Sequence, residues 1–196
     1  MSETYWQQQH KTPLFSDILW SRPETKQGAG KLLIIGGNSY GFAAPAQAYE
    51  AAVAAGIGTM RVLLPISTQK LLSHLEGAVF APQNPSGSFS RQALDAMLMH
   101  SQWADAVLLA GELGRNSETA ITLESFVKKY TGLLCVTKDA IDYFYHNPVA
   151  LLDRPQTLIV ASIEQLQKLA LHAKYEQAVT FGMSTGLLVT WLHHFS

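Results

Sequence analysis

Short apolar runs alternate with helix-forming stretches along most of the chain. Six runs have the length and apolar character of buried strands, at 32–35, 59–64, 78–80, 106–110, 133–136 and 157–160. The stretch 43–55 is nearly all alanine and is followed by Gly56, which favours a helix with a glycine at its end. Apolar strands that alternate with helices are typical of a parallel sheet covered on both faces. We therefore expect an α/β protein with three layers, α/β/α, and a mostly parallel sheet.

The intervening segments predict further helices and their caps. These helices are expected at 67–75, 90–100, 116–130, 138–145 and 184–195. Ser90 is the expected N-cap of the helix at 90–100. Ser162 and Gln165 have the spacing of a capping box, which predicts another helix after the last strand. The Pro-, Ser- and Gly-containing stretch 82–88 predicts a loop.

Residues 1–30 do not share the regular pattern that begins at Lys31. We expect an N-terminal extension over 1–30 and one α/β domain over 31–196. Leu14, Phe15 and Trp20 are apolar residues in this extension, so we expect them to contact the domain or a partner subunit. This expectation favours a homo-oligomer.

Composition excludes several classes of protein. With 47% hydrophobic and 15% charged residues, the chain is not disordered as a whole. The 14 Lys and Arg against 15 Asp and Glu leave no basic surface for a nucleic-acid backbone. Cys135 is the single cysteine, which excludes a disulfide scaffold, and its strand-like surroundings predict a buried, inert thiol. No run of about 18 apolar residues and no signal-peptide pattern is present, so we expect a cytoplasmic protein with no membrane span.

Candidate chemistry lies where the predicted strands end, because ligands of open parallel sheets bind there. The first strand is followed by Gly36-Gly-Asn-Ser-Tyr-Gly41 and then by the alanine helix. Asn38, Ser39 and Gly41 are candidate ligand contacts, since small residues and a helix N-terminus suit an anion. The segment lacks both the GxGxxG and the Walker patterns. A tight turn with no ligand explains it equally well.

Two further strand ends carry polar candidates. The fourth strand is followed by Gly111-Glu-Leu-Gly-Arg-Asn-Ser117, in which Arg115 suits a phosphate. The alternative is that Asn116 caps the helix and Arg115 is solvated. Asp139 follows the fifth strand and suits a ribose, a magnesium-bound water or a base. The alternative is that Asp139 caps the short helix.

The segment Gly182–Gly186 matches the GxSxG nucleophile pattern. No Asp or Glu follows Ser184, and His193 and His194 come only a few residues later. A hydrolase triad is therefore disfavoured. The histidines also lack the spacing of a metal-binding helix, so no metal site is predicted.

Four segments resemble, in order and spacing, the motifs of a known family. Residues 22–37 read RPETKQGAGKLLIIGG, and 51–62 read AAVAAGIGTMRV, similar to an ALRAGAGLV step. Residues 105–115, DAVLLAGELGR, resemble DAVVIGPGLGR, and 137–141, TKDAI, resemble DADAL. Together they resemble the ADP-dependent NAD(P)H-hydrate dehydratases of the ribokinase-like superfamily, over roughly residues 22–170.

The resemblance implies a ribokinase-like fold with a crevice for a hydrated nicotinamide dinucleotide, NAD(P)H hydrate. It also implies an adjacent site for ADP or ATP and leaves a need for magnesium open. The nicotinamide-side contacts would fall on Ala43, Ala44, Glu112 and Gly114, with Asp139 nearby.

The chain departs from the family at several positions. Glu112 replaces a central glycine, Thr137 replaces the first Asp of DADAL, and Ser162 replaces a histidine that touches substrate. The family's Gly-Ser-Gly-Asp segment, which carries the catalytic base, is not found, and Gly182–Gly186 holds no Asp.

Two functions follow from these departures. We expect a dehydratase-like protein of nicotinamide nucleotide repair that is inactive as this chain alone. The domain would then be incomplete at its C-terminus, either as a fragment or as a reduced protein. The alternative is a non-catalytic nucleotide-binding or oligomerising protein on the same scaffold.

Overall fold

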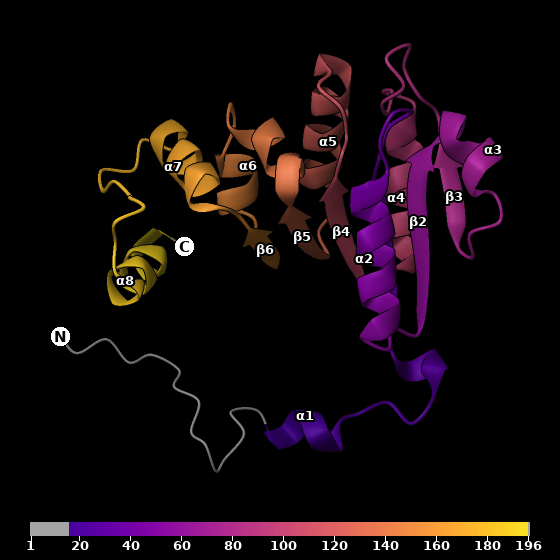
Figure 1. Ribbon diagram of the computed structural model, residues 1–196, viewed down its shortest axis with the longest axis horizontal. Helices are drawn as coiled ribbons and strands as arrows, with labels where there is room; N and C mark the ends of the chain where they lie inside the picture. Colours follow the sequence, from indigo (N-terminus) through magenta and orange to yellow (C-terminus); the bar gives the residue numbers. More distant parts are fainter. Residues whose placement is uncertain (1–15, 196) are drawn as a thin grey trace.

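The computed structural model describes residues 16–195 and is built around one six-stranded sheet (Figure 1). All neighbouring strands pair in parallel. The strands are β1 (Lys31–Gly36), β2 (Thr59–Pro65), β3 (Ala78–Ala81), β4 (Ala106–Gly111), β5 (Leu133–Thr137) and β6 (Thr157–Val160). The six predicted strands are confirmed, and so is the predicted parallel sheet.

The strand order is β3-β2-β1-β4-β5-β6. The chain moves outward from β1 to β3, then returns to the other side of β1 and continues from β4 to β6. The order therefore reverses between β1 and β4, which pair directly, with Leu33 opposite Val107. Loops leave this reversal point in opposite directions, so it is where a doubly wound sheet opens a crevice at its carboxyl edge.

Helices lie on both faces of the sheet, which confirms the three-layer architecture. One face carries α4 (Ala93–Trp103) and α5 (Ser117–Lys129), and the other carries α2 (Ala43–Ala54), which contacts β1 and β4. The remaining helices are α1 (Ser16–Trp20), α3 (Gln69–Leu72), α6 (Val149–Leu152), α7 (Ile163–His172) and α8 (Thr185–Phe195). Within residues 16–195 there are also three 3-10 helices, η1 (Lys26–Gly28), η2 (Ile66–Thr68) and η3 (Lys138–Phe144).

The main core lies between the sheet and helices α4 and α5. Its largest fully buried side chains include Phe89, Met97, Phe126 and Phe144. Burial of each such side chain stabilises the fold by about 1.5–3 kcal/mol. A smaller cluster beneath α2 consists of Ile34, Val62, Leu64 and Ala110. The sheet is therefore buried on both faces around β1, β2 and the carboxyl end of β4.

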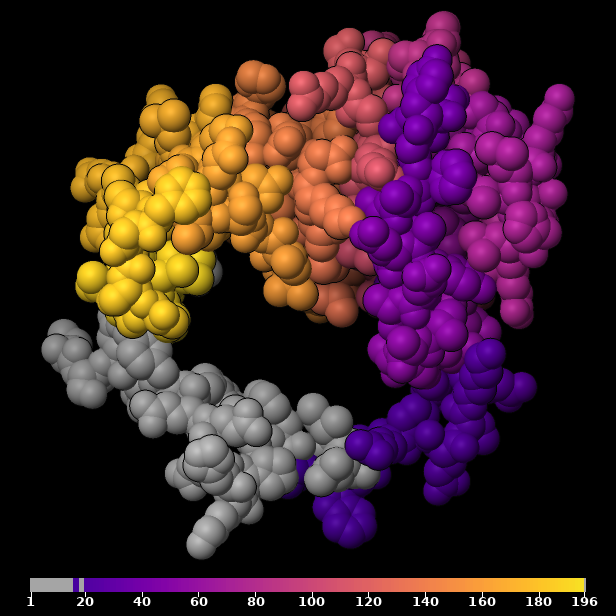
Figure 2. Space-filling model, in the orientation of Figure 1, coloured from indigo at the N-terminus to yellow at the C-terminus, as the bar shows by residue number. Residues whose placement is uncertain are grey.

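The face of β4–β6 opposite the main core is less well covered. In register, Cys135 of β5 lies between Leu108 and Leu158. Leu158 is 58% exposed and Val160, on the same face of β6, is 55% exposed. Figure 2 shows this region as an open surface between α2 and the α7–α8 end of the molecule. Among residues 16–195, no helix packs closely over these side chains.

Several local predictions are confirmed. Asn116 caps α5, as the alternative for the turn after β4 had it, and its side-chain oxygen accepts from the Glu118 N–H at 2.8 Å. Ser162 and Gln165 form the predicted capping box of α7.

Other local predictions need correction. Ser90 is not an N-cap, because α4 begins at Ala93 and the N-cap position is Gln92. Two turn residues separate Ser90 from the helix. The Ser90 carbonyl accepts from the Ala93 N–H, while its buried hydroxyl has no partner among the described residues. The helix predicted at 67–75 is shorter, and the one at 138–145 is a 3-10 helix.

The N-terminal region lies outside the sheet as far as it is described. Leu14 and Phe15 lie outside the described residues, and Trp20 of α1 is 89% exposed. Cys135 is half-buried in β5, less than predicted, and burial raises the pKa of its thiol. Within residues 16–195, no helix combines the length and apolar character needed to cross a membrane.

Candidate functional site

Asn38 organises the turn that follows β1. Its backbone N–H donates to the Gly41 carbonyl at 2.8 Å, and its side-chain oxygen accepts from the Tyr40 N–H at 2.7 Å. The side-chain Nδ2 donates to the Glu112 carbonyl at 2.7 Å. Asn38 therefore joins the turn after β1 to the turn after β4.

The turn after β4 has an unusual backbone. Gly111, Glu112 and Gly114 all have positive φ, at 99°, 54° and 78°. For Glu112 this left-handed conformation costs about 1–2 kcal/mol. A Cβ on Gly111 would lie 2.4 Å from Asp139 Oδ1, so only glycine fits there.

Asp139 holds this turn in place from the end of β5. Its carboxylate accepts from the Glu112 N–H at 2.7 Å and from the Leu113 N–H at 3.3 Å. The N-cap of η3 is Thr137, so Asp139 stabilises the β4 turn rather than capping its own helix. Both carboxylate oxygens are thereby engaged with backbone amides.

The Glu112 side chain reaches the N-terminus of α2. Its Oε2 accepts from the Ala44 N–H at 2.8 Å. A Cβ on Gly41 would come within 3.5 Å of Oε1, so the carboxylate packs against this glycine. The N-cap of α2, Phe42, offers no side-chain acceptor of its own. Glu112 therefore caps a helix that lies far from it in the sequence.

Tyr143 of η3 is a site residue that sequence reasoning missed. Its hydroxyl donates to the Gly114 carbonyl. Burial raises the pKa of Tyr143 to about 12, with smaller opposing effects from the Asn116 backbone and the Arg115 charge. The phenol is therefore a neutral donor at pH 7. A tyrosine within a short helix gave no signal in the sequence, because its partner comes from another strand end.

Ser39 and Arg115 lie at the periphery of this arrangement. The Ser39 hydroxyl shares a hydrogen bond with Ser67, 2.5 Å away, and the Ser39 N–H donates to the Gly87 carbonyl at 2.9 Å. Arg115 is exposed. A Cβ on Gly114 would collide with Ser88, so the 82–88 loop closes on this edge of the sheet.

The structure thus brings most of the predicted candidates to one edge of the sheet. Direct hydrogen bonds link Asn38, Glu112, Ala44 and Asp139, and Gly41 and Gly114 lie in the same turns. Whether these residues bind a ligand stays a prediction. The arrangement supplies carboxylate acceptors and a neutral phenol, but no cluster of three or more His, Cys, Asp or Glu suited to a metal occurs within residues 16–195.

The residues at this edge do not form an open cradle for the phosphates of ADP or ATP. Pro45 has no N–H, so the first turn of α2 offers only the amides of Ala43 and Ala44. The Ala44 amide is already bound to Glu112. The same residues are poorly placed to bind magnesium, because Glu112 and Asp139 direct carboxylate oxygens to backbone amides.

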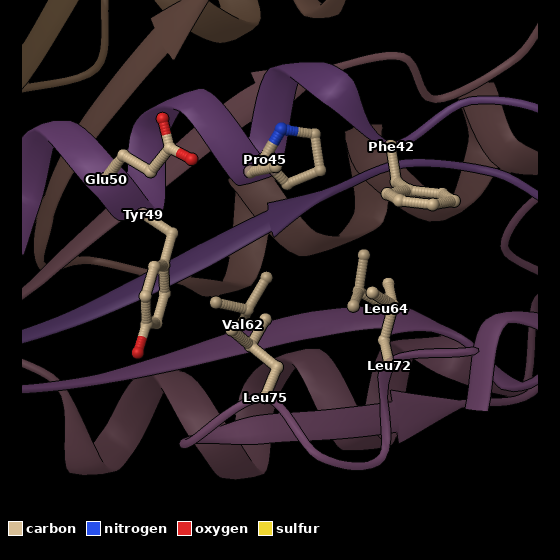
Figure 3. Close-up of a pocket in the computed structure, with 9 residues that line it drawn as sticks. Phe42, Pro45, Tyr49, Glu50, Val62, Leu64, Leu72 and Leu75 are labelled. Carbon is tan, nitrogen blue, oxygen red and sulfur yellow. The ribbon is translucent and has the colours of Figure 1, made fainter. Parts of the chain in front are cut away.

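A separate apolar pocket of about 220 Å³ lies on the other side of the start of α2 (Figure 3). The helix places Phe42, Pro45 and Tyr49 over Val62 and Leu64 of β2. Its remaining lining residues are Ala46, Glu50, Leu72 and Leu75. This lining suits an apolar group and does not include the strand-end candidates.

Ser184 of the GxSxG segment directly precedes α8, far along the sequence from the strand-end residues. Its hydroxyl accepts from the Leu187 N–H at 3.4 Å. His193 and His194 lie in the last turn of the same helix. The Ser184 side chain therefore interacts with the first turn of α8.

Comparison with solved structures confirms the fold class. A ribokinase-like superfamily protein of Enterococcus faecalis superposes with a TM-score of 0.60 at 19% identity, over 77% of this chain and 52% of that one. A hypothetical protein of Streptococcus mutans gives a TM-score of 0.58 at 21% identity, over 85% of this chain and 56% of that one. The chain has a ribokinase-like fold and spans about half of each neighbour.

Comparison with curated proteins confirms the family resemblance over part of the chain. The bifunctional NAD(P)H-hydrate repair enzyme Nnr of Methanothermobacter thermautotrophicus is 33% identical over 102 residues, 52% of this chain. The enzyme of the same name from Methanocaldococcus jannaschii is 29% identical over 122 residues, 60% of this chain. The matches span 20% and 23% of those proteins, so the chain corresponds to about a fifth of their length. No protein-family model matches the chain.

Proposed function

We propose that this chain is an NAD(P)H-hydrate dehydratase-like protein of nicotinamide nucleotide repair that binds the hydrated dinucleotide without dehydrating it. The observation that carries the proposal is the hydrogen-bonded junction of the turns after β1, β4 and β5. These turns carry the motifs that resemble the dehydratases, and they meet where the strand order reverses. The likeness to the repair enzymes supports the same ligand class.

The hydrogen bonds that engage the Asp139 and Glu112 carboxylates support binding without catalysis. A general base needs a carboxylate oxygen that can reach a substrate proton. Asp139 directs both oxygens to the β4 turn, and Glu112 directs Oε2 to Ala44. The expected need for ADP or ATP, the cytoplasmic location and the role of magnesium stay predictions.

Calorimetric titration with hydrated NADH tests the binding. We expect saturable binding to the wild type and at least about tenfold weaker binding to Asn38→Ala, because that variant loses the bond that joins two turns. Asn147→Ala is the matched control, since Asn147 is exposed and outside the site. Absence of binding to the wild type would refute the proposal.

A dehydration assay tests the second half of the proposal. With hydrated NADH, ADP or ATP, and magnesium, we expect NADH to form no faster than in the uncatalysed reaction. Formation above that rate by the wild-type chain would show that it supplies its own base.

A second candidate function, an oligomerising protein on this scaffold, is favoured by one observation. The β4–β6 face exposes Leu158 and Val160, and apolar surface of this kind marks interaction sites. Light scattering would test it with Leu158→Lys and Val160→Lys. We expect these variants to lower the assembly mass, whereas Leu171→Lys, at a 75% exposed position on α7, should not. A monomeric wild type would exclude this function.

A further inference from the structure

We infer that Glu112 is a specificity-determining residue that closes the α2 end of the strand-end site to phosphate groups. The inference concerns the charge that the site accepts, and it stands whether or not the dinucleotide binds. It rests on the position of one carboxylate, on the backbone that holds it there and on the few amides that α2 can offer.

The Glu112 carboxylate takes the position that a bound anion would occupy. A helix N-terminus attracts anions through its free N–H groups and its dipole. Here the Ala44 N–H donates to Glu112 Oε2 at 2.8 Å, and Pro45 supplies no donor. A phosphate placed there would lose one of two amides and would meet a negative charge at close range.

The carboxylate is held in place by its neighbours. The Glu112 N–H donates to Asp139 Oδ1 at 2.7 Å, and its carbonyl accepts from Asn38 Nδ2 at 2.7 Å. Both backbone polar groups are therefore fixed while φ stays at +54°. These bonds fix the backbone from which the side chain extends, and the bond from the Ala44 N–H together with the packing against Gly41 holds the carboxylate at α2.

The second carboxylate oxygen of Glu112, Oε1, determines which ligand groups this part of the site can bind. Within residues 16–195, no hydrogen-bond donor reaches Glu112 Oε1. A ligand group that reaches it must donate, as a hydroxyl, a carboxamide or a cation does. A dinucleotide in this site would therefore direct a hydrogen-bond donor, and not its phosphates, toward α2.

The test uses inorganic pyrophosphate as the anion probe and the Ala44 amide signal in NMR as the local readout. In the wild type we expect pyrophosphate to leave the Ala44 signal unchanged. In Glu112→Gly it should shift that signal saturably, with an affinity at least about tenfold above any binding by the wild type. Glycine adopts positive φ freely, so this variant keeps the turn.

Two further variants complete the experiment. Glu112→Gln keeps the side-chain length without the charge and should also gain pyrophosphate binding. Glu118→Gln is the matched control, because the Glu118 carboxylate accepts from the Arg91 N–H, at 2.9 Å, and not from α2. This variant should behave as the wild type. A saturable Ala44 shift in the wild type as strong as in Glu112→Gly would overturn the inference. Failure of both Glu112 variants to bind pyrophosphate would also overturn it.

Discussion

Replacing Asp139 with alanine tests whether one carboxylate holds the β4 turn. The variant loses the bonds to the Glu112 and Leu113 amides, at 2.7 and 3.3 Å. A hydrogen bond to a charged group contributes about 1.5–3 kcal/mol, and the longer bond contributes less. We therefore expect the free energy of unfolding to fall by about 2–3 kcal/mol, or Tm to fall by roughly 5–10 °C.

Urea unfolding followed by circular dichroism provides the measurement. The slope with denaturant should stay unchanged, because the loss is local. Asp105→Ala is the control, since among the described residues Asp105 accepts one hydrogen bond, from the Lys31 N–H at 2.8 Å, and that bond is solvent-exposed and lies at the opposite end of β4. Because water competes for this exposed bond, whereas the Asp139 bonds are partly buried, we expect that control to lose about 1 kcal/mol or less. If Asp139→Ala costs no more than Asp105→Ala, Asp139 does not hold the turn.

Three further changes test other parts of the fold. Arg154→Met should cost about 2–3 kcal/mol in urea unfolding, because the guanidinium donates to the carbonyls of Tyr130 and Gln156, which precede β5 and β6. A loss below about 0.5 kcal/mol would contradict this. Gly58→Ala should cost about 3 kcal/mol, since its Cβ would lie 2.2 Å from a backbone oxygen of η1, whereas Gly182→Ala meets nothing and should be neutral. Burial, and then the Arg61 charge, lower the pKa of His100 from its ordinary value of 6.5. The folded state therefore disfavours protonation, so unfolding by urea should become easier as the pH falls below 6.5, and less so in His100→Gln. Equal pH dependence of the two proteins would contradict that reasoning.

The sequence predicted the strands well because each one is apolar on both faces. Runs such as Leu33-Ile34-Ile35 have no exposed side, which only a parallel sheet covered by helices on both faces accommodates. The caps at Asn116 and Ser162 were also predictable, since each bond joins residues close in the chain. The predicted N-cap at Ser90 was wrong, although it too relied on residues close in the chain, because local spacing does not show where a turn ends and a helix begins.

The site was predictable only as a set of strand-end residues. The sequence placed Asn38, Glu112 and Asp139 after three different strands, and the family resemblance suggested that they meet. It could not show that Asp139 serves the β4 turn or that Tyr143 reaches Gly114. Those contacts depend on η3 folding back toward the neighbouring strand end.

By itself, therefore, the sequence determined the α/β architecture and the residues at the carboxyl ends of the strands, because hydrophobic period and local caps act over a few residues. The tertiary structure alone decided that Glu112 caps α2 through Ala44. The two residues come together only because β4 pairs beside β1, and no pattern within either segment specifies that pairing. The sequence alone shows that Glu112 carries a negative charge. The strand order places that charge at the N-terminus of α2.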